Sequence, residues 1–326
     1  MDISVILDQL IRLFLILCFG AVLAKIDILD THTKQKLTKL MLYVTTPLMI
    51  LDAFNDRLAM MQSENMAESG VSVWYLFAVS GGFYLVMTLL AWITVHLMKM
   101  PKANRSLYTF MTIFGNVGFM GFPVALAVCG NEGLFYAAIL NCVFNILIYT
   151  VGVVMMAGGN TTEHQSAWKM MQPKKLLFTP GVLCCAVAVI LFSFRIALPG
   201  ILADTFDTLG GLTSPLAMLV VGANLAGMPW KKMFTDYRLN VYTLVRQLVI
   251  PLCMWLLIRI CITNEILASV LLLMAAMPIA NMAALFATEY KADEALASQA
   301  IFVTTLFSLF SLPLIVWICS TWIPLG

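Results

Sequence analysis

Residues 114–123 read FGNVGFMGFP and lie inside a long apolar segment. Three glycines and a proline in so short a stretch disfavour a continuous helix, because glycine lowers helix propensity and proline removes a backbone donor. In lipid, the backbone groups freed at such a break are tolerated only where protein or a water-filled cavity satisfies them. The stretch therefore predicts a helix that is interrupted inside a membrane.

A second apolar segment is interrupted in the same way, where residues 276–281 read AMPIAN. An asparagine accompanies each break, Asn116 in the first and Asn281 in the second. If both helices unwind at the same depth and cross, two half-helix N-termini point at one place, each with about half a positive charge. Such ends suit a carboxylate. A single break is more typical of close helix packing or a kink, but a matched pair predicts a binding site.

The whole chain is strongly apolar. Hydrophobic residues make up 61% of the 326 residues and charged residues 11%, whereas about a quarter of a soluble domain is charged. Because about 20 apolar residues span a bilayer, the sequence predicts a polytopic all-α membrane protein with ten transmembrane helices. The ten predicted spans are 3–25, 37–54, 72–98, 106–128, 133–157, 177–197, 206–227, 239–260, 265–288 and 295–319.

The basic residues of the loops predict the orientation. With the N-terminus outside, the inner loops hold fourteen of the 19 lysines and arginines and the outer loops hold three. Basic residues concentrate in cytoplasmic loops. We therefore expect a multi-pass protein of the plasma (inner) membrane with both termini on the extracytoplasmic side.

The two halves of the chain repeat each other. TTPLMIL at 45–51 is echoed by TSPLAML at 213–219, and the two broken helices occupy the fourth and ninth spans. Five spans per half is an odd number, so the second half enters the membrane from the opposite side, as in inverted-repeat carriers. We expect a first five-helix repeat at 1–157, a short cytoplasmic connecting loop at 158–175 and a second, inverted repeat at 176–326.

These motifs resemble the auxin efflux carrier family, which includes plant PIN carriers and bacterial malate and malonate permeases. Asn116 through Pro123 resembles the family's fourth-helix motif, and FATEY at 286–290 resembles its signature after the second crossing helix. Tyr43 through Leu51 is similar to its second helix and Leu140 through Cys142 to its fifth. The resemblance implies two inverted five-helix repeats with crossed, broken helices 4 and 9. It also implies a scaffold and a transport domain, elevator-type movement of an organic anion, and a homodimer.

The resemblance implies that Asn116 binds the substrate carboxylate and that spans two and five line the pocket. Arg246, followed by Gln247, lies inside span eight, where a cation could hold a second carboxylate; a structural pair or snorkelling to the surface is the equal alternative. Asn224, Gln299, Thr304 and Thr305 are expected to make interhelical hydrogen bonds. The predicted substrate-binding residues are Asn116, Gly115, Pro123, Thr46, Asn141, Asn145, Tyr149, Pro278, Asn281, Arg246 and Gln247.

The predicted function is secondary transport of small organic anions, such as malate or malonate, across the plasma membrane by elevator-type alternating access. An auxin-like indole carboxylate carrier and an anion channel are the alternatives. The expected partners are a small carboxylate, the lipid bilayer and a second copy of the chain, with no nucleic acid. The three scattered histidines do not suggest an enzyme, and no metal or cofactor is expected. A coupling proton or sodium ion is unsupported and stays open.

Overall fold

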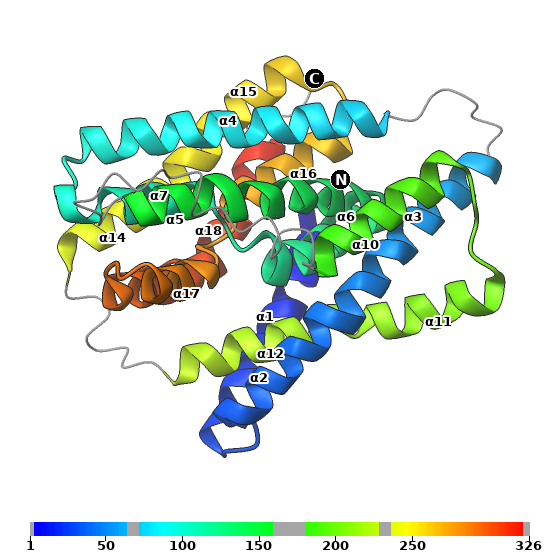
Figure 1. Ribbon diagram of the computed structural model, residues 1–326, viewed down its shortest axis with the longest axis horizontal. Helices are drawn as coiled ribbons and strands as arrows, with labels where there is room; N and C mark the ends of the chain where they lie inside the picture. The colour runs from blue at the N-terminus through cyan, green and yellow to red at the C-terminus, as the bar shows by residue number, and fades with distance from the viewer. Residues whose placement is uncertain (1–2, 64–71, 159–179, 228–235, 322–326) are drawn as a thin grey trace.

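The computed structural model describes residues 3–63, 72–158, 180–227 and 236–321 (Figure 1). Regular structure in these ranges is helical, with one isolated β-bridge, so the all-α prediction is confirmed. The helices of the first half are α1 (Ile3–Lys25), α2 (Thr31–Leu40), α3 (Thr46–Ser63), α4 (Val73–Leu97), α5 (Arg105–Ile113), α6 (Phe122–Leu147) and α7 (Val153–Gly158). Those of the second half are α10 (Pro180–Ser193), α11 (Gly200–Gly211), α12 (Thr213–Ala226), α14 (Tyr237–Leu244), α15 (Ile250–Cys261), α16 (Glu265–Ala276), α17 (Met282–Glu289) and α18 (Glu294–Thr321).

Six helical segments among the described residues are long and apolar enough to cross a membrane, which confirms an integral multi-pass protein. They are Thr31–Ala59, Val73–Leu97, Val117–Ala157, Gly200–Ala226, Tyr237–Cys261 and Glu294–Ile318. The ten crossings and the inverted repeat stay predictions. Apart from Gly158, the predicted connecting loop at 158–175 lies outside the described residues.

The second predicted span, 37–54, is too short. The helix runs from Thr31 without interruption into α3, and its apolar part extends to Ala59. It begins early because the Asp30 side chain accepts a hydrogen bond from the Thr33 N–H (2.7 Å) and caps the first turn. The apolar criterion missed this start because the capped turn is polar.

Three π-helical turns precede prolines at a fixed spacing. They cover Met41–Thr45, Val117–Gly121 and Val245–Val249, and a proline follows two residues after each, at Pro47, Pro123 and Pro251. A proline ring clashes with the carbonyl four residues earlier, which is the middle residue of each turn. The helix widens locally to relieve that clash, and such turns are frequent at functional sites.

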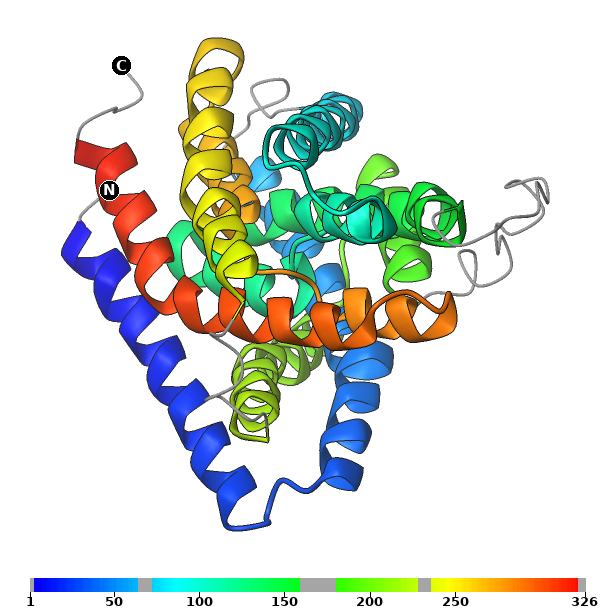
Figure 2. The same ribbon diagram turned by 90° about the vertical axis from the view of Figure 1, so that its left-hand side faces the viewer.

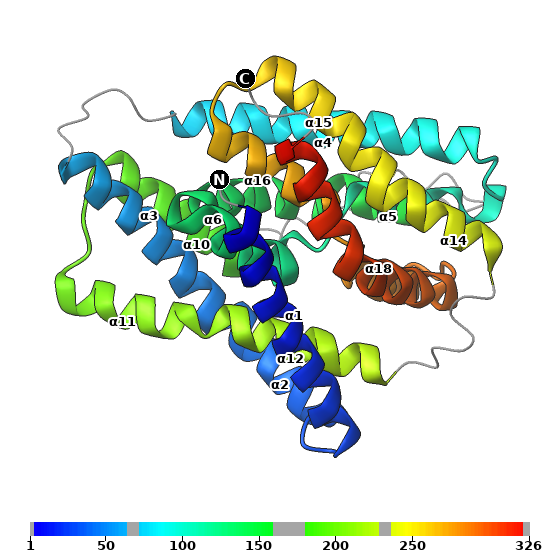
Figure 3. The same ribbon diagram turned by 180° about the vertical axis from the view of Figure 1, so that it is seen from behind.

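The helices form two packed groups that each draw on both halves of the chain. In the first, α1 packs along α12, and α3 packs against α10 and α11. Figure 2 shows α1 at the outer flank of the molecule, and Figure 3 shows it passing over α12. The other group contains α4, α5, α14, α15, α16, α17 and α18, and α6 contacts both groups.

The two echoed motifs meet inside the first group. The hydroxyl of Thr213 donates a hydrogen bond to the hydroxyl of Thr45 (2.8 Å), and both side chains are buried. These are the first residues of the two motifs. Contact between equivalent residues is what a two-fold relation produces close to its axis.

Candidate functional site

The two predicted helix breaks are present, and they are joined to each other. Helix α5 ends at Ile113 and α16 ends at Ala276, and each is followed by a short extended segment. These segments pair antiparallel at Gly115 and Ile279. The Asn116 N–H donates to the Pro278 carbonyl (2.7 Å), and the Ala280 N–H donates to the Phe114 carbonyl (3.1 Å). The backbone groups freed by one break thus satisfy those freed by the other, as burial requires.

Asn116 caps the helix that restarts after the first break. Its side-chain oxygen accepts a hydrogen bond from the Phe119 N–H (3.3 Å), and its backbone carbonyl accepts from Met120 and Gly121. The side-chain Nδ2 has no hydrogen-bond partner among the described residues, and the residue is 5% exposed. A nearly buried amide with a free donor is suited to a ligand that accepts hydrogen bonds.

Three of the predicted site residues form a column on α6 and the turn after it. Asn141, Asn145 and Tyr149 follow one another at a spacing of four, which places them on one helix face. The Asn141 side-chain oxygen lies 3.9 Å from where a Cβ on Gly118 would be, so this face meets the first break. Asn145 donates to the Asn141 carbonyl (2.8 Å), and the Tyr149 ring lies 6.1 Å from that of Phe286 on α17.

Arg246 lies next to the paired segments at Gly115 and Ile279, which we call the crossing. It is fully buried, so it does not snorkel to the surface. Its Nη1 donates to the Ala275 carbonyl (2.7 Å), and its Nε makes a long contact with the Met111 carbonyl (3.5 Å). Its Nη2 has no hydrogen-bond partner and lies 3.1 Å from where a Cβ on Gly115 would be. The guanidinium therefore touches both helices that end at the crossing.

Gln247 joins its own helical segment to α18. Its Nε2 donates to the Thr304 carbonyl (3.1 Å), and its Oε1 accepts from the Ser311 hydroxyl (3.2 Å). The Thr304 hydroxyl in turn accepts a hydrogen bond from the Ile279 N–H (3.2 Å), in the second break. The interhelical role predicted for Thr304 is confirmed, and it holds the second break in place.

We expect Thr304→Val to lower the free energy of unfolding by about 1–3 kcal/mol, because valine leaves the buried Ile279 N–H without a partner. Thr243→Val is the matched control, since the buried Thr243 hydroxyl bonds only the Leu239 carbonyl of its own helix (2.9 Å). Thermal unfolding in detergent measures both variants. Equal losses of stability in the two variants would show that the hydrogen bond to Ile279 adds nothing to the free energy of unfolding.

A cavity of about 360 Å³ lies beside the second break, large enough for a small carboxylate. It is lined from α12, α17 and α18, with Lys34 of α2 also contributing. Its polar lining residues are Lys34, Asn224, Asn281, Ser298 and Thr305. Asn281, predicted from the break motif, therefore faces a cavity, whereas Ser298 carried no signal in the sequence.

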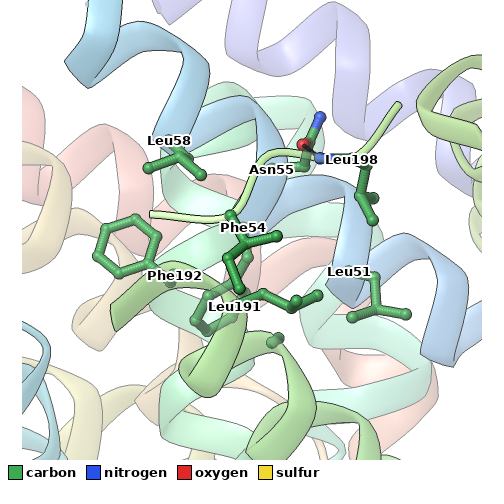
Figure 4. Close-up of a pocket in the computed structure, with 9 residues that line it drawn as sticks. Leu51, Phe54, Asn55, Leu58, Leu191, Phe192 and Leu198 are labelled. Carbon is green, nitrogen blue, oxygen red and sulfur yellow. Dashed lines mark hydrogen bonds between the residues drawn. The ribbon is translucent and has the colours of Figure 1, made fainter. Parts of the chain in front are cut away.

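A second hollow, between α3 and α10, does not fit a ligand. Figure 4 shows Phe54, Leu191 and Phe192 in its lining, and its volume is about 10 Å³. Asn55 is its polar lining residue, and the Asn55 side-chain oxygen accepts a hydrogen bond from the Leu198 N–H (2.9 Å). This space has room for about one water molecule.

The remaining predicted residues lie at or near the two breaks or at the repeat contact. Gly115 and Pro278 form the paired segments, and Pro123 begins α6. Thr46 is half-buried at the start of α3, where its neighbour Thr45 makes the contact with Thr213. The structure thus gathers Gly115, Asn116 and Pro278 directly, with Arg246 against them.

Comparisons with known proteins match the chain to membrane transport proteins. The family model described as "Membrane transport protein" matches residues 5–316. An uncharacterized transporter of Methanocaldococcus jannaschii is 29% identical over 226 residues, covering 68% of this chain and 71% of that protein. A Rhizobium meliloti protein named "Putative malonate transporter" is 26% identical over 239 residues, covering 72% of this chain and 73% of the relative.

Proposed function

Because the chain belongs to the membrane transport protein family, which is the auxin efflux carrier family, we propose that it is a secondary transporter of small organic anions. The observation that carries this proposal is the pair of broken helices joined at Gly115 and Ile279. Two helices restart there with their N-terminal ends, and the free amide of Asn116 adds a donor. Helix N-termini with nearby donors are suited to a carboxylate.

The proposed substrate is a short carboxylate such as malonate or malate. One of the relatives carries malonate in its name, and the cavity beside the second break has the volume for a molecule of that size. Its lining combines one cation, Lys34, with the neutral polar residues Asn224, Asn281, Ser298 and Thr305. Such a lining suits a compact polar anion better than an indole ring.

The orientation and the mechanism are part of the same proposal. The connection from α4 to α5 and the one from α10 to α11 lie at opposite ends of the long axis (Figure 1). This supports their assignment to opposite membrane faces, the first cytoplasmic and the second extracytoplasmic. In the proposed elevator mechanism, the group around the crossing slides against the group of α1, α3, α10, α11 and α12, which would also supply a homodimer interface.

Transport into liposomes tests the proposal. We expect purified protein in proteoliposomes to exchange labelled malonate or malate with internal carboxylate, with saturation at high substrate concentration. We also expect a bound carboxylate at 100 times its dissociation constant to stabilise the protein by about 2.7 kcal/mol in thermal unfolding. Unsaturable single-channel currents would instead indicate an anion channel, and selective exchange of indole acetate would indicate an auxin-like carrier.

A further inference from the structure

Four helix ends meet at the crossing, and their dipoles oppose one another. Helices α5 and α16 end there with their carbonyls, whereas α17 and the helix that leads into α6 begin there with their N–H groups. Each C-terminal end carries about half a negative charge and each N-terminal end about half a positive charge. The backbone alone therefore gives little net preference for an anion over a neutral ligand.

Arg246 changes this balance because of where its guanidinium lies. Met111 and Ala275 belong to the last turns of α5 and α16, whose final carbonyls have no partner within the helix. Arg246 binds both carbonyls. One full positive charge thus offsets the negative ends of both helices at once.

No carboxylate of the described residues forms an ion pair with the guanidinium. Among the described residues, the ion pair that forms is between Arg57 and Glu132, away from the crossing. The titratable groups that face Arg246 are the hydroxyls of Tyr84, on α4, and Tyr242, on its own helical segment. The Tyr84 hydroxyl and Arg246 Nη2 are both buried without a hydrogen-bond partner. A fully buried cation without a carboxylate is costly, and a negatively charged ligand held at the crossing offsets that cost.

We propose that Arg246 is the positioning residue that makes the crossing selective for anions, acting through the helix ends rather than by touching the substrate. It cancels the two negative helix ends, so the two positive ends and the Asn116 amide act on the ligand unopposed. These two ends supply about one positive charge, which balances one carboxylate group of the ligand. This inference rests on the proposed function and names the charge that the site requires.

The test compares a charged probe with a neutral one of the same shape. Binding of malonate and of malonamide is measured by calorimetry on the purified full-length chain. In Arg246→Met we expect malonate to bind at least roughly 30-fold more weakly, as when one partner of a buried charge interaction is removed, while malonamide changes less than threefold. Arg105→Met is the control, because Arg105 also donates to a backbone carbonyl, that of Met100 (3.1 Å), but lies away from the crossing. It should retain the preference for malonate.

Arg246→Lys keeps the inference testable if the methionine variant does not fold. Burial lowers the pKa of a lysine, so the cation introduced at this position is lost as pH rises. Malonate affinity should then fall as the pH rises from about 6.5 to about 9.5 in Arg246→Lys. It should stay level in the wild type, whose arginine keeps its charge. A level profile in the lysine variant, or an unchanged malonate preference in Arg246→Met, would overturn the inference. If the wild type binds no carboxylate at all, the proposed function fails with it.

Discussion

Asn116→Ala is expected to lose nearly all carboxylate transport while the protein stays folded. The Asn116 side chain has two roles: its oxygen caps the restarting helix, and its Nδ2 has no partner among the described residues. A hydrogen bond to a charged group contributes about 1.5–3 kcal/mol. Losing that bond to the substrate weakens binding by roughly 10- to 100-fold. Exchange of labelled malonate in proteoliposomes measures the transport loss, and calorimetry measures the loss of affinity.

The matched control separates the cap from the ligand contact. Asn264 is also a helix-capping asparagine, since its side-chain oxygen accepts from the Leu267 N–H (2.8 Å) at the start of α16. Asn264→Ala should cost about 1 kcal/mol of stability, as loss of a cap does, and should leave transport close to the wild-type rate. If both variants transport equally well, Asn116 has only a capping role, and the crossing loses its main side-chain donor.

The helix breaks were predictable because their signals are local. Proline and glycine act on the backbone where they stand, so residues 114–123 and 276–281 indicated the interruptions without knowledge of any partner. The hydrogen bonds that join the two breaks, from Asn116 to Pro278 and from Ala280 to Phe114, required the fold.

Arg246 shows where sequence reasoning stops. Its depth in an apolar span indicated a functional or structural cation, and these two readings could not be separated. The carbonyl of Met111 is 135 residues away in the chain and that of Ala275 is 29 residues away. No periodicity connects residues at such separations, so the contact of Arg246 with two helix ends could not be predicted.

The sequence predicted a repeat, but it did not predict how the two halves of the chain pack against each other. The motifs beginning at Thr45 and Thr213 predicted two related halves, and the structure places these two residues in contact. The halves interleave rather than forming separate lobes, since α1 of the first packs along α12 of the second. A hydrophobic span does not reveal which neighbour it packs against, because most of its surface is apolar in either arrangement.

The contact between α1 and α12 predicts the largest loss of stability, in Gly222→Ala. The two helices approach so closely that a Cβ at position 222 would overlap the Leu17 carbonyl, and one at Gly20 would overlap the backbone of Leu219. Small residues allow such close approach in membranes. Because the obstacle is backbone on both sides, the alanine methyl group forces the helices apart and costs about 3 kcal/mol or more.

Gly82→Ala is the matched control for that loss. Gly82 lies inside α4, is exposed and has nothing within 4 Å of where its Cβ would be. Alanine there should be neutral or stabilising by up to about 1 kcal/mol, from helix propensity alone. Thermal unfolding in the same detergent gives both values. The α1–α12 contact belongs to the group proposed to stay fixed during transport, so Gly222→Ala should also reduce exchange in proteoliposomes. If Gly222→Ala melts at the same temperature as Gly82→Ala, α1 and α12 can move apart without loss of stability. The proposal that these helices belong to a group that stays fixed during transport would then be wrong.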